Sequence, residues 1–569
     1  MHTMLNAFCS RILPAVALGM TMSFGLSLDA AASQQHDHQV VPADADVPLF
    51  EGLGDHHFPI TTQSETAQAY FDQGLIFTYG FNHFEAVRSF REAVRHDEDC
   101  AMCYWGVALA LGPHINAPMM PDDVQPAYEA LQQALHLAPE ASEREQAYIE
   151  ALSERYSADP PEDRTALDRS YADAMRDVAE RYPDDLDART LFAESLMNLV
   201  PWDYWAEDGE PRGETAELVE ALEAVLEQEP YHPGANHLYI HAMENSPAPE
   251  RAEGAADRLA ELNIQIGHMI HMPAHIYARV GRWHDASVAN EQAIEADRAY
   301  LEAYEVDGMV PLLYHPHNIH FLAWTAGMEG RSNLAIDAAD ELVAATPAEM
   351  AADLPFLKNY LITPSVTQVR FEHWDDVLAT PEPDLDSPFM RGMWHYARGL
   401  ALAAGSDLDE ARAEAARLTD IAASDEAQAL ELPEAFLPGA TMLGIADATL
   451  QGEIMLREGQ PDEAVERLRR AVELQDTLPY MEPPYWSNSA RLDLGRALLE
   501  ADRPAEAEEV YRADLEQYPR NGWALHGLAR SLQAQGKDEA AEEVAARFEE
   551  AWQQADMAFA EGSAELVTR

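Results

Sequence analysis

Histidines are concentrated in one part of this 569-residue chain, at spacings that bring several imidazoles onto one side of a helix. The stretch GHMIHMPAHIYARVGRWHDA, residues 267–286, holds His268, His271 and His275 within eight residues. At 3.6 residues per turn these positions fall within about 60° of one another. Neutral imidazole nitrogen is the commonest protein ligand for zinc, copper, nickel and iron. The stretch therefore predicts a metal site.

The segment before this stretch carries histidines in the same register. His237 precedes His271 by 34 residues, and His241 precedes His275 by the same interval. Imidazoles on two helices packed about 8–10 Å apart can converge on one ion. Glu244 follows His241 by three residues and offers an oxygen ligand or an orienting partner for an imidazole.

The segment after it, PHNIHFLAWTAGMEGRSNLA, places His317, His320 and Trp324 in the same phase. The expected ligands of a transition metal, Zn or Cu, are His237, His241, His271, His275 and His320, and the expected ligand-contacting residues are Trp202, Asp203, Asn236, Glu244, His268, His317 and Trp324. Two other interpretations stay open. The imidazoles bind an organic or peptide ligand, or they hydrogen-bond to one another and to Asn236 and Asn318.

A single CxxC pair, Cys100 and Cys103 in CAMCYWG, offers further chemistry. We expect it at the opening of a helix, where the helix dipole lowers thiol pKa values. It predicts a local disulfide, a redox pair, or half of a soft-metal site completed by His96 or His114. HExxH, GxSxG and P-loop motifs are absent from the sequence, so no catalytic residue is assigned.

Helices must position these side chains, because glycine and proline separate helical windows and alternating β-branched runs are nearly absent. The windows recur, as in FDQGLIFTYGFNHFEAVRSFREAVRHDE and LDLGRALLEADRPAEAEEVYRADLEQYP. Weaker stretches at 113–126, 202–213, 299–317 and 381–388 predict loops on one face. The expected class is an all-α helical repeat.

These windows resemble the tetratricopeptide repeat, a 34-residue helix-turn-helix unit, over most of residues 65–555. The resemblance implies a right-handed superhelical α-solenoid with a concave groove, in which the histidines contact a protein, peptide or small ligand. The set CAMCYWG, LGPHIN, PWDYW, GANHLYIHAMENS, HMPAHIYARVGRW and HNIHFLAW resembles a family of exported, uncharacterised bacterial tetratricopeptide proteins. That family supplies no catalytic residues.

Charge and the N-terminal sequence restrict partners and location. Asp and Glu number 101 against 37 Lys and Arg, a net charge of −64 that repels nucleic acid and anionic lipid. Arg11 precedes an apolar run over 12–28, and small residues follow near Ser33. This pattern predicts a cleaved signal peptide, a periplasmic or secreted protein and no membrane span after cleavage. An uncleaved anchor is the alternative.

The expected organisation is a signal peptide (1–32), a flexible segment (33–64), N-terminal repeats with the CxxC pair (65–200), His-rich repeats (201–345), C-terminal repeats (346–555) and a tail (556–569). We predict a binding protein that holds a transition metal, or a ligand through that metal, in its groove. One alternative is a metal-dependent enzyme that uses the same histidines. The other is a protein-interaction scaffold without metal.

Overall fold

The computed structural model describes residues 47–304, 308–351, 354–384, 386–431, 437–559 and 566–568. The expected signal peptide lies outside these residues. The described residues form two compact units, one made of residues 47–277 and 291–315 and the other of residues 278–290 and 316–568. We call them the N-terminal and the C-terminal unit. Helices α13, α14 and α15 each contribute residues to both.

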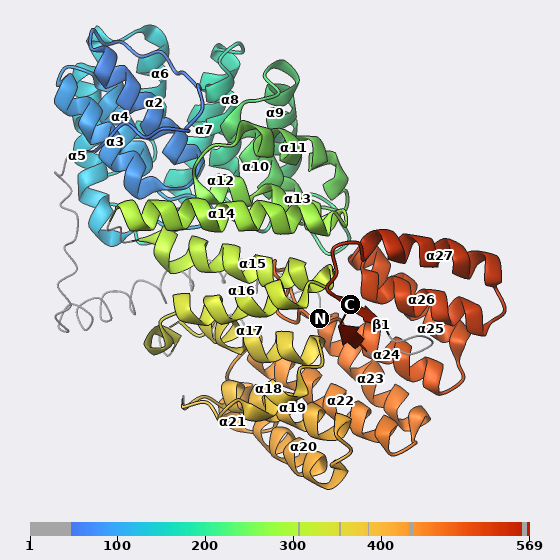
Figure 1. The fold of residues 1–569 in the computed structure, drawn as a ribbon. Helices are drawn as coiled ribbons and strands as arrows, with labels where there is room; N and C mark the ends of the chain where they lie inside the picture. Colours follow the sequence, from blue (N-terminus) through green and yellow to red (C-terminus); the bar gives the residue numbers. More distant parts are fainter. Residues whose placement is uncertain are drawn as a thin grey trace. The chain divides into compact units, whose positions relative to one another are not determined.

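In the N-terminal unit, helices that follow one another along the chain pack as neighbours, including α2 with α3, α4 with α5, α7 with α8 and α9 with α10 (Figure 1). The elements of this unit are α2 (Glu65–Tyr79), α3 (His83–His96), α4 (Ala101–Ala110), η1 (Pro121–Asp123), α5 (Val124–Leu137), η2 (Ala138–Glu140), α6 (Glu143–Ser153), α7 (Thr165–Arg181), α8 (Leu186–Met197), α9 (Thr215–Gln228), α10 (Pro233–Met243), η3 (Pro249–Ala252), α11 (Glu253–Leu262), α12 (Gly267–His271), α13 (Pro273–Arg279) and the π turn η4 (Val310–Tyr314).

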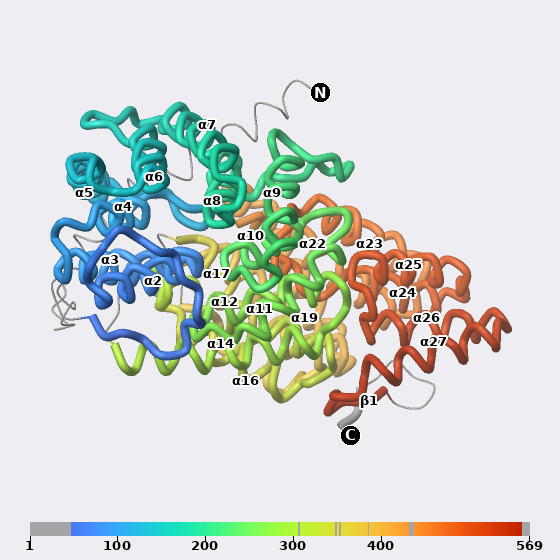
Figure 2. Tube along the Cα trace, turned by 90° about the horizontal axis from the view of Figure 1, so that it is seen from above, coloured from blue at the N-terminus to red at the C-terminus, as the bar shows by residue number. Residues whose placement is uncertain are grey.

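The C-terminal unit continues this pattern, and Figure 2 shows α22 to α27 following one another as paired helices. Its elements, together with the shared helices α14 and α15, are α14 (Trp283–Ala303), α15 (His315–Met328), α16 (Ser332–Ala345), η5 (Ala348–Ala351), α17 (Leu357–Arg370), α18 (Trp374–Ala379), α19 (Pro388–Ala404), α20 (Leu408–Ala422), α21 (Asp425–Gln428), α22 (Gly439–Arg457), α23 (Pro461–Gln475), α24 (Ala490–Glu500), α25 (Pro504–Gln517), α26 (Gly522–Ala534), α27 (Asp538–Ala551), β1 (Met557–Phe559) and β2 (Leu566–Thr568).

Small residues explain how these helices approach one another. Tyr511 on α25 is 4% exposed, and its ring lies between α24 and α26. A Cβ atom at Gly495 would lie 2.4 Å from Tyr511 Cζ, and one at Gly527 would lie 2.1 Å from it. Real Cβ atoms do not make contacts this short, so glycine is required at both positions. The recurring glycines of the sequence therefore fix how closely one helix pair stacks on the next.

The predicted all-α class and its repeated helix-turn-helix architecture are confirmed. The segment predicted as a tail adds a small antiparallel pair, in which β1 and β2 align Met557 with Thr568. No helix among the described residues is long and apolar enough to cross a membrane.

Candidate metal centre

Helix α10 carries two of the predicted metal ligands, and all eleven of its residues are buried. His232 caps its N-terminus, because its Nδ1 accepts a hydrogen bond of 3.1 Å from the backbone N–H of Ala235. Pro233 then occupies the first turn, where no backbone N–H is needed. A helix buried on every side leaves its polar side chains without water, so His237 and His241 need partners within the protein.

His268, on the short helix α12, meets these two histidines. Its Nε2 lies 3.2 Å from Nε2 of His237. One ring nitrogen from each of His237, His241 and His268 lies within 4.8 Å of the other two. We call these three residues the histidine cluster. All three side chains are buried, with exposed fractions of 5% or less.

In two of these rings, Nδ1 already has a hydrogen-bond partner. Nδ1 of His237 lies 2.5 Å from the backbone oxygen of Tyr79, and Nδ1 of His241 lies 3.2 Å from Oε1 of Glu244. Both partners are acceptors, so each Nδ1 carries the proton and donates it. A neutral imidazole protonated at Nδ1 keeps its lone pair at Nε2, which is the arrangement that carbonyl and carboxylate partners give to metal-bound histidines. Nε2 of His241 is buried without a hydrogen-bond partner.

Aromatic rings pack against the histidine cluster. The ring centroid of Phe81 lies 4.6 Å from that of His237 and 5.7 Å from those of His241 and His268. Tyr314 stacks on His268 at 4.6 Å. Phe81 has a φ of 55°, a left-handed conformation that a bulky residue rarely adopts. Such strained residues persist where the surrounding structure fixes them, and they concentrate at functional sites.

Burial keeps the three rings neutral. It lowers the pKa of His241 and lowers the pKa values of His237 and His268 further, and the neighbouring histidines act in the same direction. Glu244 shows the opposite balance, because burial alone would raise its pKa whereas His275 and His241 hold it at about 2. The cluster therefore presents unprotonated nitrogens beside one ionised carboxylate.

Two other predicted ligands lie next to Glu244. Oε2 of Glu244 is 2.6 Å from Nδ1 of His275, whose Nε2 lies 2.8 Å from Nε2 of His271. Glu244 thus joins His241 to His275, which the 34-residue spacing placed side by side. The same spacing placed His237 beside His271, whereas in the structure His237 faces His268.

A second group in the N-terminal unit converges on Asp187. Oδ1 of Asp187 accepts a hydrogen bond of 2.6 Å from the Tyr79 hydroxyl and lies 3.0 Å from Nε2 of His56 and 3.3 Å from Nε2 of His232. Nδ1 of His232 already accepts the helix-capping bond from Ala235, so its proton is on Nε2. Because the proton is on Nε2, His232 has no lone pair on the side that faces Asp187. It therefore acts as a hydrogen-bond donor and not as a metal ligand. We assign this group a structural role.

The remaining predicted residues of the N-terminal unit differ in their roles. Trp202 packs its edge on His241, with ring centroids 5.1 Å apart, and donates through Nε1 to the backbone oxygen of Ile115. Asp203 pairs with Arg212 at 2.9 Å within its own loop. The side-chain amide nitrogen of Asn236 donates to two backbone oxygens and its oxygen accepts from Arg258, so its polar atoms hold the helix terminus.

Three predicted residues lie on α15 in the C-terminal unit. His320 packs against Tyr360 at 5.0 Å, and burial lowers its pKa to about 3. The ring of His317 contacts Phe321 at 5.8 Å. Trp324 packs against Trp283 at 5.3 Å.

The CxxC pair opens a helix, as predicted. Cys100 is the N-cap of α4, and its Sγ lies 2.08 Å from that of Cys103, which is a disulfide bond. Of the arrangements that the sequence left open, the structure contains the local disulfide. Both residues are fully buried.

Sequence reasoning missed Tyr79, Phe81, His56 and Asp187. Tyr79 is 158 residues from His237 along the chain, so no local spacing connects them. The one signal was the window FTYGFNHF, which places two aromatic residues around a glycine at a helix end.

The C-terminal unit also contains a groove of about 510 Å³. Arg370 and Trp523 line it, and the guanidinium lies 5.6 Å from the ring centroid. Arg370 donates to Asn488 Oδ1 and to the Ser487 backbone oxygen, both of which are neutral acceptors. Burial lowers its pKa to about 10. The groove therefore presents a cation beside an aromatic surface.

Comparisons with known proteins give similarity of fold only. No protein-family model matches the sequence, and neither does any curated protein. Among solved structures, the chain is similar to the APC/C hetero-tetramer Cut9–Hcn1, with 12% identity, a TM-score of 0.30 and coverage of 83% of this chain and 78% of that one. For yeast Tom70 the identity is 13%, the TM-score 0.28 and the coverage 85% and 91%. For the human IFIT1 dimer with m7Gppp-AAAA these values are 10%, 0.28, 86% and 90%.

Proposed function

We propose that this protein binds a transition-metal ion, Zn or Cu, through Nε2 of His237, His241 and His268. One observation carries the proposal. Nδ1 of His237 and of His241 is occupied by an oxygen acceptor, so both lone pairs are left at Nε2 inside a buried cluster. Buried imidazole nitrogens without a proton are prepared ligands, because no proton has to be displaced.

The spacing of the nitrogens agrees with this proposal. Two nitrogens bound tetrahedrally at about 2.0–2.1 Å from one ion lie roughly 3.3 Å apart. Nε2 of His237 and Nε2 of His268 are 3.2 Å apart. A hydrogen bond between the two rings has a similar length, so a metal titration must decide between the two interactions.

The ligand number favours one further candidate, a metal-dependent enzyme. Structural zinc sites usually have four protein ligands, whereas catalytic sites have three and an open position. Three histidines meet in this cluster. An exchangeable water on the bound ion would favour the enzyme, and a closed coordination shell would favour storage or structure.

Location and partners belong to the same proposal. The sequence pattern of residues 1–32 supports export to the periplasm or beyond the cell. A protein or peptide partner would use the groove of the C-terminal unit, where Arg370 and Trp523 offer a cation and an aromatic surface. Fractionation of cells, followed by detection of the native protein in the periplasmic or the extracellular fraction, would test the location.

A metal titration of untagged, metal-free protein tests the proposal. We expect close to one Zn²⁺ or Cu²⁺ per chain, and an affinity at least tenfold lower for His268→Ala and for His241→Ala. The double variant should lose little more than either single variant, because the ligands of one ion act as a unit. His136→Ala, an exposed histidine on α5, is the control.

Two results would overturn the metal proposal. One is a content below about 0.2 metal ions per chain after reconstitution, since three buried, neutral imidazoles should retain a transition metal at neutral pH. The other is unchanged affinity in a folded His268→Ala protein, which would mean that the cluster is a set of packed, hydrogen-bonded rings.

A further inference from the structure

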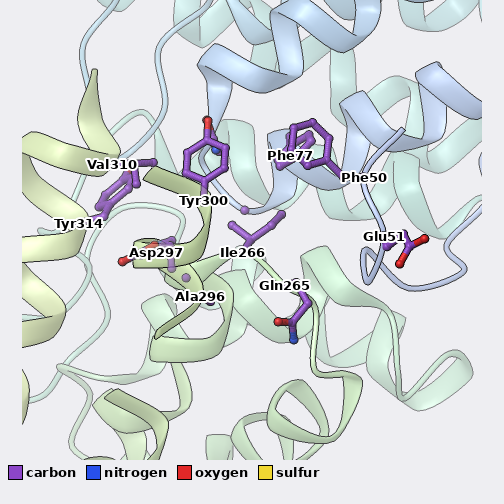
Figure 3. Close-up of a pocket in the computed structure, with 14 residues that line it drawn as sticks. Phe50, Glu51, Phe77, Gln265, Ile266, Ala296, Asp297, Tyr300, Val310 and Tyr314 are labelled. Carbon is purple, nitrogen blue, oxygen red and sulfur yellow. The ribbon is translucent and has the colours of Figure 1, made fainter. Parts of the chain in front are cut away.

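The groove of the C-terminal unit is large enough for a small organic ligand. Its volume is about 510 Å³, within the range of roughly 300–1,000 Å³ that is typical of ligand-binding clefts. The pocket of the N-terminal unit in Figure 3, which Phe50, Ile266 and Tyr300 line, encloses about 40 Å³. One bound water needs about 10–15 Å³. Of these two cavities, only the groove therefore admits a ligand with several carbon atoms.

Neutral acceptors hold Arg370, at the end of α17, in this groove. Its Nε donates a hydrogen bond of 2.7 Å to Oδ1 of Asn488, and its Nη2 donates one of 2.6 Å to the backbone oxygen of Ser487. Its Nη1 donates to Sδ of Met328 at 3.3 Å. A guanidinium has five N–H donors, so one donor remains on Nη1 and one on Nη2. A carboxylate can accept two such donors side by side.

The charge of Arg370 has no counter-ion in the part of the chain that the structure describes. No ion pair joins its guanidinium to a carboxylate there. Asp514 attracts it from a greater distance, and burial raises the pKa of that carboxyl group. A cation that is partly removed from water without a counter-ion is costly to maintain. A bound anion would remove this cost.

The other charged residues of the groove largely neutralise one another. Arg496 pairs with Glu453 at 2.5 Å and with Asp493 at 3.4 Å, and Arg457 pairs with Glu453 at 2.7 Å. Arg530 makes no hydrogen bond or ion pair with the described residues. The lining has four arginines and four acidic residues, whereas the whole chain has 101 acidic and 37 basic residues. An anion therefore meets less repulsion in the groove than over the rest of the protein.

The surface beside Arg370 is aromatic and apolar. The ring centroid of Trp523 lies 5.6 Å from the guanidinium, and Nε1 of Trp523 donates a hydrogen bond of 3.0 Å to the backbone oxygen of Gly327, which fixes the ring. Tyr396 and Tyr511 also line the groove, together with five leucines. A ligand whose charged group reaches Arg370 would therefore place its carbon skeleton against apolar surface, where burial is favourable.

We propose that this groove binds a small organic acid, whose carboxylate pairs with Arg370 and whose apolar body lies against Trp523 and the leucines. A monoanion suits the site, because one held guanidinium neutralises one negative charge. The site lies within the C-terminal unit and does not depend on a metal in the histidine cluster. Its occupant is a small molecule, in place of the protein or peptide partner.

Calorimetric titration of the full-length, metal-free protein with phenylacetate tests the inference, with phenylacetamide as the uncharged probe of similar size. We expect one phenylacetate per chain and about tenfold weaker binding of phenylacetamide, or weaker still. Arg370→Gln should lower the affinity at least about tenfold. Arg370→Lys should lower it at least about threefold, because lysine keeps the charge but loses the paired donors. Ala404→Trp should abolish binding, since it fills the groove from α19 without altering its charge. Arg470→Gln, an exposed arginine on α23, should leave it unchanged.

The inference is overturned if phenylacetate does not bind saturably, or if phenylacetamide binds equally well. It is also overturned if folded Arg370→Gln retains the wild-type affinity. Should Arg370→Gln fail to fold, unchanged affinity in Arg370→Lys and Ala404→Trp would contradict the site. Binding of a peptide with an acidic side chain but not of phenylacetate would make the groove a peptide-binding surface instead. Because the protein is stripped of metal, failure here leaves the metal proposal intact, and failure of the metal titration leaves this one intact.

Discussion

Asp187 shows how one carboxylate holds several elements together. Its Oδ1 meets the hydroxyl of Tyr79 on α2 and the imidazoles of His56 and His232. Burial disfavours its charge, yet the hydrogen bonds from His232 and His56 lower its pKa far below the ordinary value. The N-terminal segment, α2, α8 and the start of α10 are thereby joined at one atom.

We predict that Asp187→Asn lowers the free energy of unfolding at pH 7 by about 2 kcal/mol, typical of hydrogen bonds to a charged group. Since the folded pKa is depressed, the contribution of Asp187 is fully present above the unfolded pKa of about 3.9 and is lost as the pH falls below it. Urea unfolding of both proteins should therefore show a difference at pH 7 that shrinks towards pH 3. Asp184→Asn, an exposed neighbour, should change little. A constant difference at both pH values would contradict the prediction.

The histidines show which contacts the 34-residue spacing in the sequence predicted and which it did not. The 34-residue interval placed His241 near His275, and the structure joins them through Glu244. The interval gave no indication of His237 meeting His268, because these two residues are 31 positions apart and the 34-residue spacing pairs His237 with His271.

At the scale of elements, most of the helical architecture could be predicted because it rests on local signals. Glycine, proline and apolar periodicity predicted paired helices, and the structure has them. The contacts of Tyr79 and Phe81 with the histidine cluster could not be predicted, since they join α10 and α12 to the turn after α2. The β1–β2 pair is three residues per strand, too short for an alternating pattern to stand out.

We predict that Gly527→Ala destabilises the C-terminal unit by about 1–3 kcal/mol, the usual cost of overpacking. The added Cβ would lie 2.1 Å from Cζ of Tyr511, a ring atom that cannot move independently. Gly405→Ala, where the added Cβ atom would lie 3.5 Å from the backbone oxygen of Ala401, is the matched control and should be tolerated. Thermal unfolding followed by circular dichroism measures both. Equal melting temperatures for the two variants would contradict the prediction, because they would show that the helices accommodate the added Cβ atom at position 527 without loss of stability.

At the scale of the whole molecule, the dominant quantity is its charge of −64. Arginines are mostly paired, as in Arg496, which lies between Glu453 and Asp493. With 101 acidic and 37 basic residues, at least 64 carboxylates have no basic residue of their own to pair with. The compact state must therefore tolerate strong repulsion between like charges.

This excess leads to a prediction about salt. Raising the ionic strength from 0.01 M to 1 M shortens the screening length from about 30 Å to about 3 Å, which weakens repulsion across the whole surface but affects short buried ion pairs much less. We therefore expect the melting temperature at pH 7 to rise with NaCl over this range. The control is pH 4.4, the isoelectric point of the sequence, where the same salt step should have little effect. A fall at pH 7 would mean that ion pairs such as Arg496–Glu453 stabilise the fold more than the surplus carboxylates destabilise it. The many arginines paired across helices would then be the main electrostatic support of the solenoid.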